Sequence, residues 1–153
     1  MEKLLKLVKE LEEHVPNYAE LQPAISAANV GWHVEHCLMV FVRIITAMET
    51  SDPALYKSTF NIKKMLVYTL NKIPRGRAKA PKIVQPTGEI MPDKLMRNIE
   101  AATLKIKALA NLQKHHHFDH PYFGKLNLKE TNKFLAIHTN HHLKIINDIM
   151  KAR

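Results

Sequence analysis

Apolar residues recur at helical spacing along most of this chain, and this period constrains the fold more strongly than any other feature. Only four glycines occur in 153 residues, and no repeated alternation of apolar and polar residues predicts a sheet. The helices predicted from this pattern cover residues 2–14, Pro23 or Ser26 to Thr50, about 92–112, and Asn127 onward. Four main helices without an internal repeat predict one all-α domain over residues 1–153, an up-down-type four-helix bundle.

The connection after the second predicted helix contains an extra short helix and a long crossover loop. Asp52 and Pro53 stand at the N-cap and first position of a short helix that we expect to reach about Leu70. Residues 71–92 hold four of the eight prolines and two of the four glycines, which is typical of an irregular connection. A connection of this length calls for a function or for a bundle crossover to explain it.

The segment between the last two predicted helices is expected to be a turn region. Asn127 and Glu130 close it, at the spacing of a capping box for the last helix. The same region contains the run His115–His117. Consecutive histidines in a turn point in different directions, so this run suits adventitious surface binding of a metal better than one fixed site.

The net charge of +9 favours acidic partners without naming one. A basic loop at residues 72–82 contributes to it and is either solvated or a guide for an anionic partner or substrate. Nucleic acid is not the favoured partner, because no aromatic residues are interleaved with these cations and no helix-turn-helix or zinc-finger signature occurs. The basic residues of the loop are Lys72, Arg75, Arg77, Lys79 and Lys82.

Cysteine usage and hydropathy bear on location. Cys37 is the only cysteine, so there is no disulfide framework, and a reducing cytoplasm is the expected compartment. A cysteine in an apolar segment is usually a small buried hydrophobe and not a nucleophile. No apolar run approaches the roughly 18 residues of a membrane span, and the charged, amphipathic start differs from a secretory signal. We expect a cytoplasmic protein that has no membrane partner.

Histidines interrupt the apolar face of the last helix. On a wheel of 100° per residue, His138 lies near the middle of that face with Phe134, and His142 lies one turn further along. Two histidines at positions i and i+4 direct their rings toward one point, as in helical zinc sites. The alternative is that they are core histidines satisfied by hydrogen bonds. His141 falls at the margin, where it can reach solvent.

The second predicted helix carries the matching polar residues. Trp32, His36, Met39 and Arg43 form one stripe on an otherwise apolar helix, and Glu35 lies beside it. This stripe faces either solvent or an internal cavity. In a cavity, His36 would meet the two histidines of the last helix, and Glu35 or Arg43 could bind substrate or orient a water molecule. His33 lies about 60° away and is the weaker choice as third ligand.

Four segments resemble those of the DinB-like superfamily of four-helix bundles. They are VGWHVEHCLMVF, PRGRAKAPKIV, HPYFGKLNLKET and IHTNHHLKII, and the similarity spans about residues 24–149. The resemblance implies a divalent metal, zinc or nickel, held by one histidine of the second helix and a His-x-x-x-His pair of the last. It carries over to His36, with His33 close in register, and to His138 and His142.

The same resemblance implies an enzyme, because characterised relatives include transferases and isomerases that act with low-molecular-weight thiols. Thiolate transfer to an electrophilic small molecule is the leading expectation, and hydrolysis is the next. No catalytic acid or base is evident, unless Glu35 or His120 serves as one. Trp32 and Met39 are expected to line the cavity, and the HPYFG turn is expected to cap its mouth. A homodimer is a further expectation. The alternative is a non-enzymatic bundle with structural histidines and a basic loop that binds an anionic partner.

Overall fold

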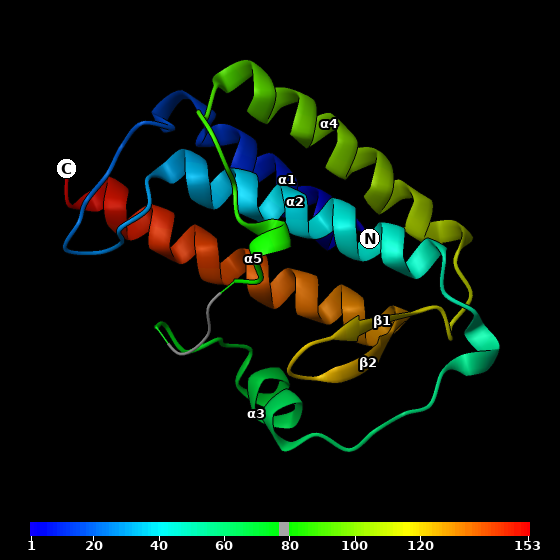
Figure 1. Ribbon diagram of the computed structural model, residues 1–153. Helices are drawn as coiled ribbons and strands as arrows, with labels where there is room; N and C mark the ends of the chain where they lie inside the picture. The colour runs from blue at the N-terminus through cyan, green and yellow to red at the C-terminus, as the bar shows by residue number, and fades with distance from the viewer. Residues whose placement is uncertain (77–79) are drawn as a thin grey trace.

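Four long helices pack into a bundle in the computed structural model, which describes residues 1–76 and 80–153 (Figure 1). They are α1 (Glu2–Glu13), α2 (Val30–Glu49), α4 (Pro92–Ala108) and α5 (Leu128–Lys151). Helices α1 and α2 each pack against both α4 and α5, so α1 and α2 lie on a diagonal. The prediction of an all-α bundle is confirmed.

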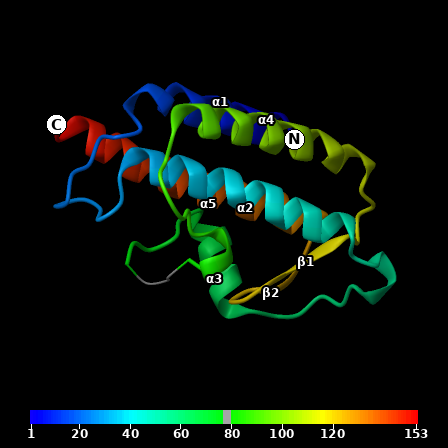
Figure 2. The ribbon, with the colours of Figure 1, turned by 45° about the horizontal axis from the view of Figure 1, so that its top comes forward.

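The connection between α2 and α4 returns the chain to the end of the bundle where α2 begins. Helices α2 and α4 therefore run in the same direction, opposite to α1 and α5 (Figures 1 and 2). This connection contains α3 (Ile62–Leu70), which packs against α5, and the single turn η3 (Lys82–Val84), which packs against α2. The long crossover is thus a structural necessity of the helix order. Arg77 and Lys79 of its basic stretch lie outside the described residues.

Side-chain caps correct two predicted helix boundaries. The side chain of Asn29 accepts a hydrogen bond from the Trp32 amide, so α2 begins at Val30 and not near residue 23 or 26. The side chain of Asp52 does act as an N-cap, but it caps only the single turn η2 (Pro53–Leu55). The expected continuous short helix is absent between residues 56 and 61, and α3 starts afresh at Ile62 under its own cap, Asn61.

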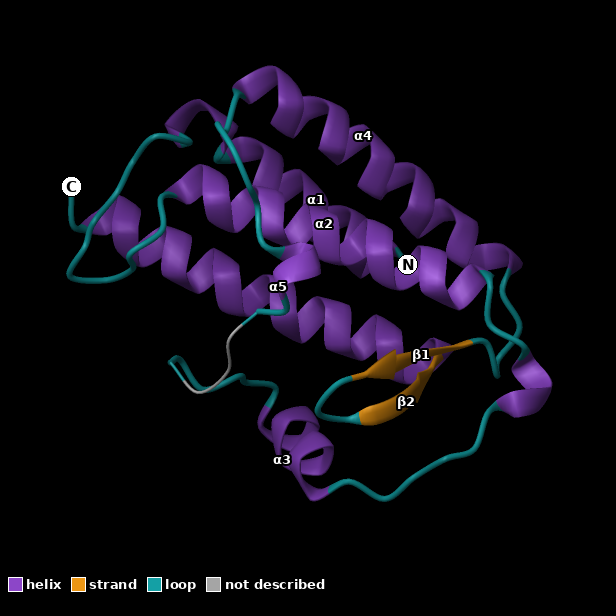
Figure 3. Ribbon diagram, viewed as in Figure 1, coloured by secondary structure: helices purple, strands orange, loops and turns teal. Residues whose placement is uncertain are grey.

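The expected turn region before α5 contains a β-hairpin (Figure 3). Strand β1 (His117–His120) pairs antiparallel with β2 (Gly124–Asn127), and Phe118 lies opposite Leu126. Gly124 has a φ of 71°, a left-handed conformation that favours glycine at the point where the chain enters β2. The predicted capping box is confirmed, because Asn127 and Glu130 bond reciprocally at the start of α5.

Helix α2 is the most deeply buried element. By length and composition it could cross a membrane, but 67% of its most apolar window is buried inside the bundle, as in the core helix of a soluble protein. Cys37 is fully buried on this helix, and burial raises the pKa of its thiol. The thiol is therefore part of the core packing, as the sequence predicted, and it does not face the pocket described below.

Candidate metal centre

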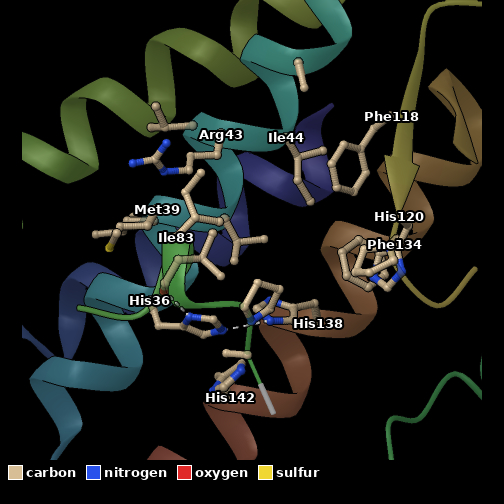
Figure 4. A pocket seen from close by; sticks show the side chains of 18 of the residues that line it. His36, Met39, Arg43, Ile44, Ile83, Phe118, His120, Phe134, His138 and His142 are labelled. Atoms are coloured by element: carbon tan, nitrogen blue, oxygen red, sulfur yellow. Dashed lines mark hydrogen bonds between the residues drawn. The ribbon is translucent and has the colours of Figure 1, made fainter. Parts of the chain in front are cut away.

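Three histidines from two helices converge at one point. His36 comes from α2, and His138 and His142 come from successive turns of α5. One ring nitrogen from each lies within 4.8 Å of the other two, and the ring centroids are 4.6–5.0 Å apart. Figure 4 shows the rings of His36 and His138 facing each other with His142 beside them. The structure thus brings together the three residues that the sequence selected as ligands.

A main-chain contact sets the tautomer of His36. Its Nδ1 lies 2.7 Å from the carbonyl oxygen of Val84 in η3, and a carbonyl can only accept, so Nδ1 carries the proton and donates. In the neutral ring Nε2 is then unprotonated, and this atom lies 3.1 Å from Nε2 of His138. The indole of Trp32 stacks on the same ring at 5.1 Å. His36 is therefore held in position and presents a lone pair toward α5.

His33 contacts the cluster from behind His142. Nδ1 of His33 lies 3.0 Å from Nδ1 of His142, and Nε2 of His33 lies 3.0 Å from the hydroxyl of Ser26. The geometric triad contains His36 and not His33, so the structure places His33 beside a candidate ligand. This arrangement leaves Nε2 of His142 without a hydrogen bond to any described residue, and Nδ1 of His138 is buried without a partner.

Burial keeps the cluster uncharged. It lowers the pKa of His138 and of His142 well below the usual value, and the neighbouring imidazoles lower both further. The pKa of His36 is lowered by burial and partly restored by the bond to Val84, and burial lowers the pKa of His33 to about 4. Neutral imidazole is the form that binds a metal, so the donor set fits a divalent ion such as zinc or nickel.

The three histidines open onto a pocket of about 890 Å³. Trp32 and Met39 line it, as the sequence predicted, and so do residues of the crossover around Val84. The β-hairpin supplies another wall, through Phe118 and the residues from His120 to Phe123. The polar stripe of α2 therefore lines a cavity, in which His36 is buried and Arg43 is exposed. A pocket of this size accommodates a small molecule.

His120 is a further polar residue of the pocket wall. Its Nδ1 accepts a hydrogen bond of 3.1 Å from the amide of Tyr122, so in the neutral ring Nε2 carries the proton. The ring stacks on Phe123 at 4.3 Å, and burial lowers its pKa to about 4. At neutral pH His120 is thus a hydrogen-bond donor and not a base.

Other residues singled out in the sequence lie away from the pocket. Glu35 is 2% exposed and points toward α4, where Lys94 Nζ lies 2.6 Å from its carboxylate. Arg75 of the basic loop pairs with Asp148 at 2.7 Å. In the described part of the chain, the run His115–His117 does not form a cluster with the spacing of a metal site.

Comparison with known proteins agrees with the geometry. A search of curated proteins and a search of solved structures each returned no significant match. The chain matches the profile of the DinB superfamily over residues 2–146, which is nearly its whole length and includes all three histidines. The helical bundle and the buried histidine cluster are those that the sequence resemblance implied. This chain therefore belongs to the DinB superfamily.

Proposed function

We propose that the chain binds one divalent metal ion, zinc or nickel, through His36, His138 and His142 and catalyses transfer of a low-molecular-weight thiol to an electrophilic small molecule. The observation that carries the proposal is the convergence of three neutral imidazoles at the wall of an apolar pocket. An ion with three protein ligands supplies an open position at which a thiol or water has a lowered pKa.

The residues around the cluster suit transfer. In the reaction, sulfur forms a bond to carbon, the bond from that carbon to its leaving group breaks, and the thiol proton passes to solvent. The largely apolar wall formed by residues such as Met39, Ile83 and Phe134 limits the water that competes as a nucleophile. The Nε2–H of His120 is available to donate a hydrogen bond to the substrate or the leaving group. A thiol cosubstrate requires a reducing compartment, which agrees with the expected cytoplasmic location.

Metal analysis separates this proposal from a purely structural role, in which ring-to-ring hydrogen bonds alone hold α2 against α5. Untagged protein carrying His115→Asn and His116→Asn, which removes the adventitious run, is expected to contain about one equivalent of metal. His138→Ala and His142→Ala are expected to lose it, and the control His14→Ala, at the end of α1, to keep it. Absence of metal, or loss in the control alone, would contradict the assignment.

Trp32 supplies a second readout. It is the only tryptophan, and it stacks on His36, so titration with nickel should quench its emission in the parent protein and not in His142→Ala. Circular dichroism of each variant shows whether loss of metal reflects loss of the ligand or loss of the fold.

Activity is tested with cysteine as the thiol and monochlorobimane as the electrophile. The expected product is the sulfur adduct with release of chloride, formed faster with metal-loaded protein than with metal-free protein or without protein. If no adduct forms but metal-loaded protein hydrolyses ester substrates, hydrolysis replaces transfer as the function.

A further inference from the structure

We propose that the pocket beside the three histidines takes an apolar small molecule bearing one anionic group, and that Arg43 binds that group. The inference rests on the proposed function only for the reactive end of this ligand, which would lie at the three histidines. Recognition of the anionic end follows from the pocket alone.

A single side chain of fixed charge lines the described part of the pocket. Aliphatic and aromatic side chains supply most of its wall. Among the described residues that line it, none is an aspartate or glutamate, and Arg43 is the only lysine or arginine. Among the described side chains, a ligand that enters this pocket therefore meets one permanent charge, and that charge is positive.

No anionic side chain in the described part of the chain neutralises Arg43. It forms no ion pair and no hydrogen bond with the side chains that the structure describes, whereas Arg75 of the crossover is paired with Asp148. Arg43 is an exposed residue, and a guanidinium presents a planar set of donors that matches a carboxylate or another oxyanion. The adjacent wall residues, Thr46 and Asn98, are neutral and can also donate hydrogen bonds to an oxyanion.

The position of Arg43 sets the length of the ligand. It lies seven residues after His36 on the same face of α2, two helical turns or about 10 Å along the axis. Figure 4 shows Arg43 beside Met39, at the end of the pocket away from His138 and His142. Ile83 lies between the two ends, and Phe134 lines the pocket beside His120. A molecule anchored at Arg43 thus spans an apolar stretch before it reaches the histidines.

Tryptophan fluorescence tests the inference directly, because Trp32 lines the pocket and is the only tryptophan. The probes are octanoate, octanamide and octylammonium, which share an apolar chain and differ in charge. The protein is first treated with EDTA so that a carboxylate cannot coordinate an ion. Octanoate is expected to bind more tightly than octanamide, and octylammonium most weakly.

Substitution of the arginine gives the decisive comparison. Arg43→Gln is expected to weaken octanoate binding about three- to tenfold and to leave octanamide unchanged, while Arg43→Lys restores part of the difference. Arg97→Gln is the matched control, because Arg97 is an exposed arginine of α4 that does not line the pocket. Arg43 is exposed, so these variants are expected to fold.

The inference is overturned if octanoate and octanamide bind equally, if neither binds, or if Arg43→Gln and Arg97→Gln behave alike. Its failure is distinguishable from failure of the proposed function. If octanoate binding depends on Arg43 in a protein that binds no metal, the metal site is refuted and the apolar anionic ligand is supported. If the protein binds metal but octanoate binding does not depend on Arg43, only the proposal of an apolar anionic ligand is refuted.

Discussion

Two lysines of α4 pair with two glutamates of α2, and they differ in how deeply the glutamate is buried. The side chains of Lys94 and Lys105 are 35% and 32% exposed, but that of Glu35 is 3% exposed and that of Glu49 is 28% exposed. One carboxylate oxygen of Glu35 is also buried without a partner. Removing Lys94 would therefore leave a charge with little access to water, whereas Glu49 would remain partly hydrated.

This difference predicts unequal effects of the same substitution. Lys94→Met should lower the free energy of unfolding by about 2–3 kcal/mol, below the usual loss for a fully buried pair because the lysine is partly exposed. Lys105→Met should lower it by less than about 1 kcal/mol. Adding Glu35→Leu to Lys94→Met should recover most of the loss, because the unpaired carboxylate is then gone.

Urea titration followed by circular dichroism measures all of these variants. Nearly equal losses in Lys94→Met and Lys105→Met would refute the reasoning that burial of the glutamate decides the outcome. Metal content should not change in Lys94→Met, because Glu35 faces α4 and not the histidines. A loss of metal in that variant, with the fold intact, would restore Glu35 as a participant in the site.

Three further predictions concern a close contact, a buried thiol and a buried imidazole. A Cβ on Gly31 would lie 2.8 Å from Cγ2 of Ile90 and 3.0 Å from the carbonyl oxygen of Tyr18. Gly31→Ala should therefore lower the free energy of unfolding by about 1–2 kcal/mol, although alanine has the better helix propensity. An unchanged free energy of unfolding in urea would contradict this prediction. Cys37 is fully buried and its pKa is raised, so a thiol reagent such as dithionitrobenzoate should label it only as fast as the protein opens, and rapid labelling of folded protein would show an accessible thiol. The pKa of His120 falls from 6.5 to about 4 on folding, so the unfolded chain binds more protons than the folded chain between these pH values. The free energy of unfolding therefore decreases as the pH falls through that range. In urea titrations at several pH values, His120→Phe should lose less stability than the parent protein, and equal losses would argue against a buried neutral ring.

The convergence of the three histidines was predictable in part because a helical period fixes angles. Residues 36, 138 and 142 fall on the buried faces of two helices whatever the crossing geometry, and neutral imidazole on such faces suggests a shared site. The same rule could have excluded Glu35, since a step of 100° from His36 turns its side chain toward a different neighbour. The role of His33 was not predictable, because its contact with His142 depends on side-chain rotamers.

The β-hairpin was missed because its signal is short. Each strand has four residues, and the polar residues Asp119, His120 and Lys125 between Phe118 and Leu126 obscure the alternation. Gly124 in the HPYFG motif was the available clue, since a glycine after an aromatic turn often marks a positive φ. The start of α2 was placed too early because Ser26 and Asn29 are both acceptable caps, and only packing selects between them.

The hydrogen bond from His36 to Val84 has a consequence for how the site can be disturbed. The acceptor is a main-chain oxygen, so replacing the side chain at position 84 leaves it in place. An insertion or deletion in the crossover, by contrast, would move that oxygen relative to α2 and release the ring to turn over. The length of the crossover, more than its amino-acid sequence, is then what engineering or natural variation would have to preserve.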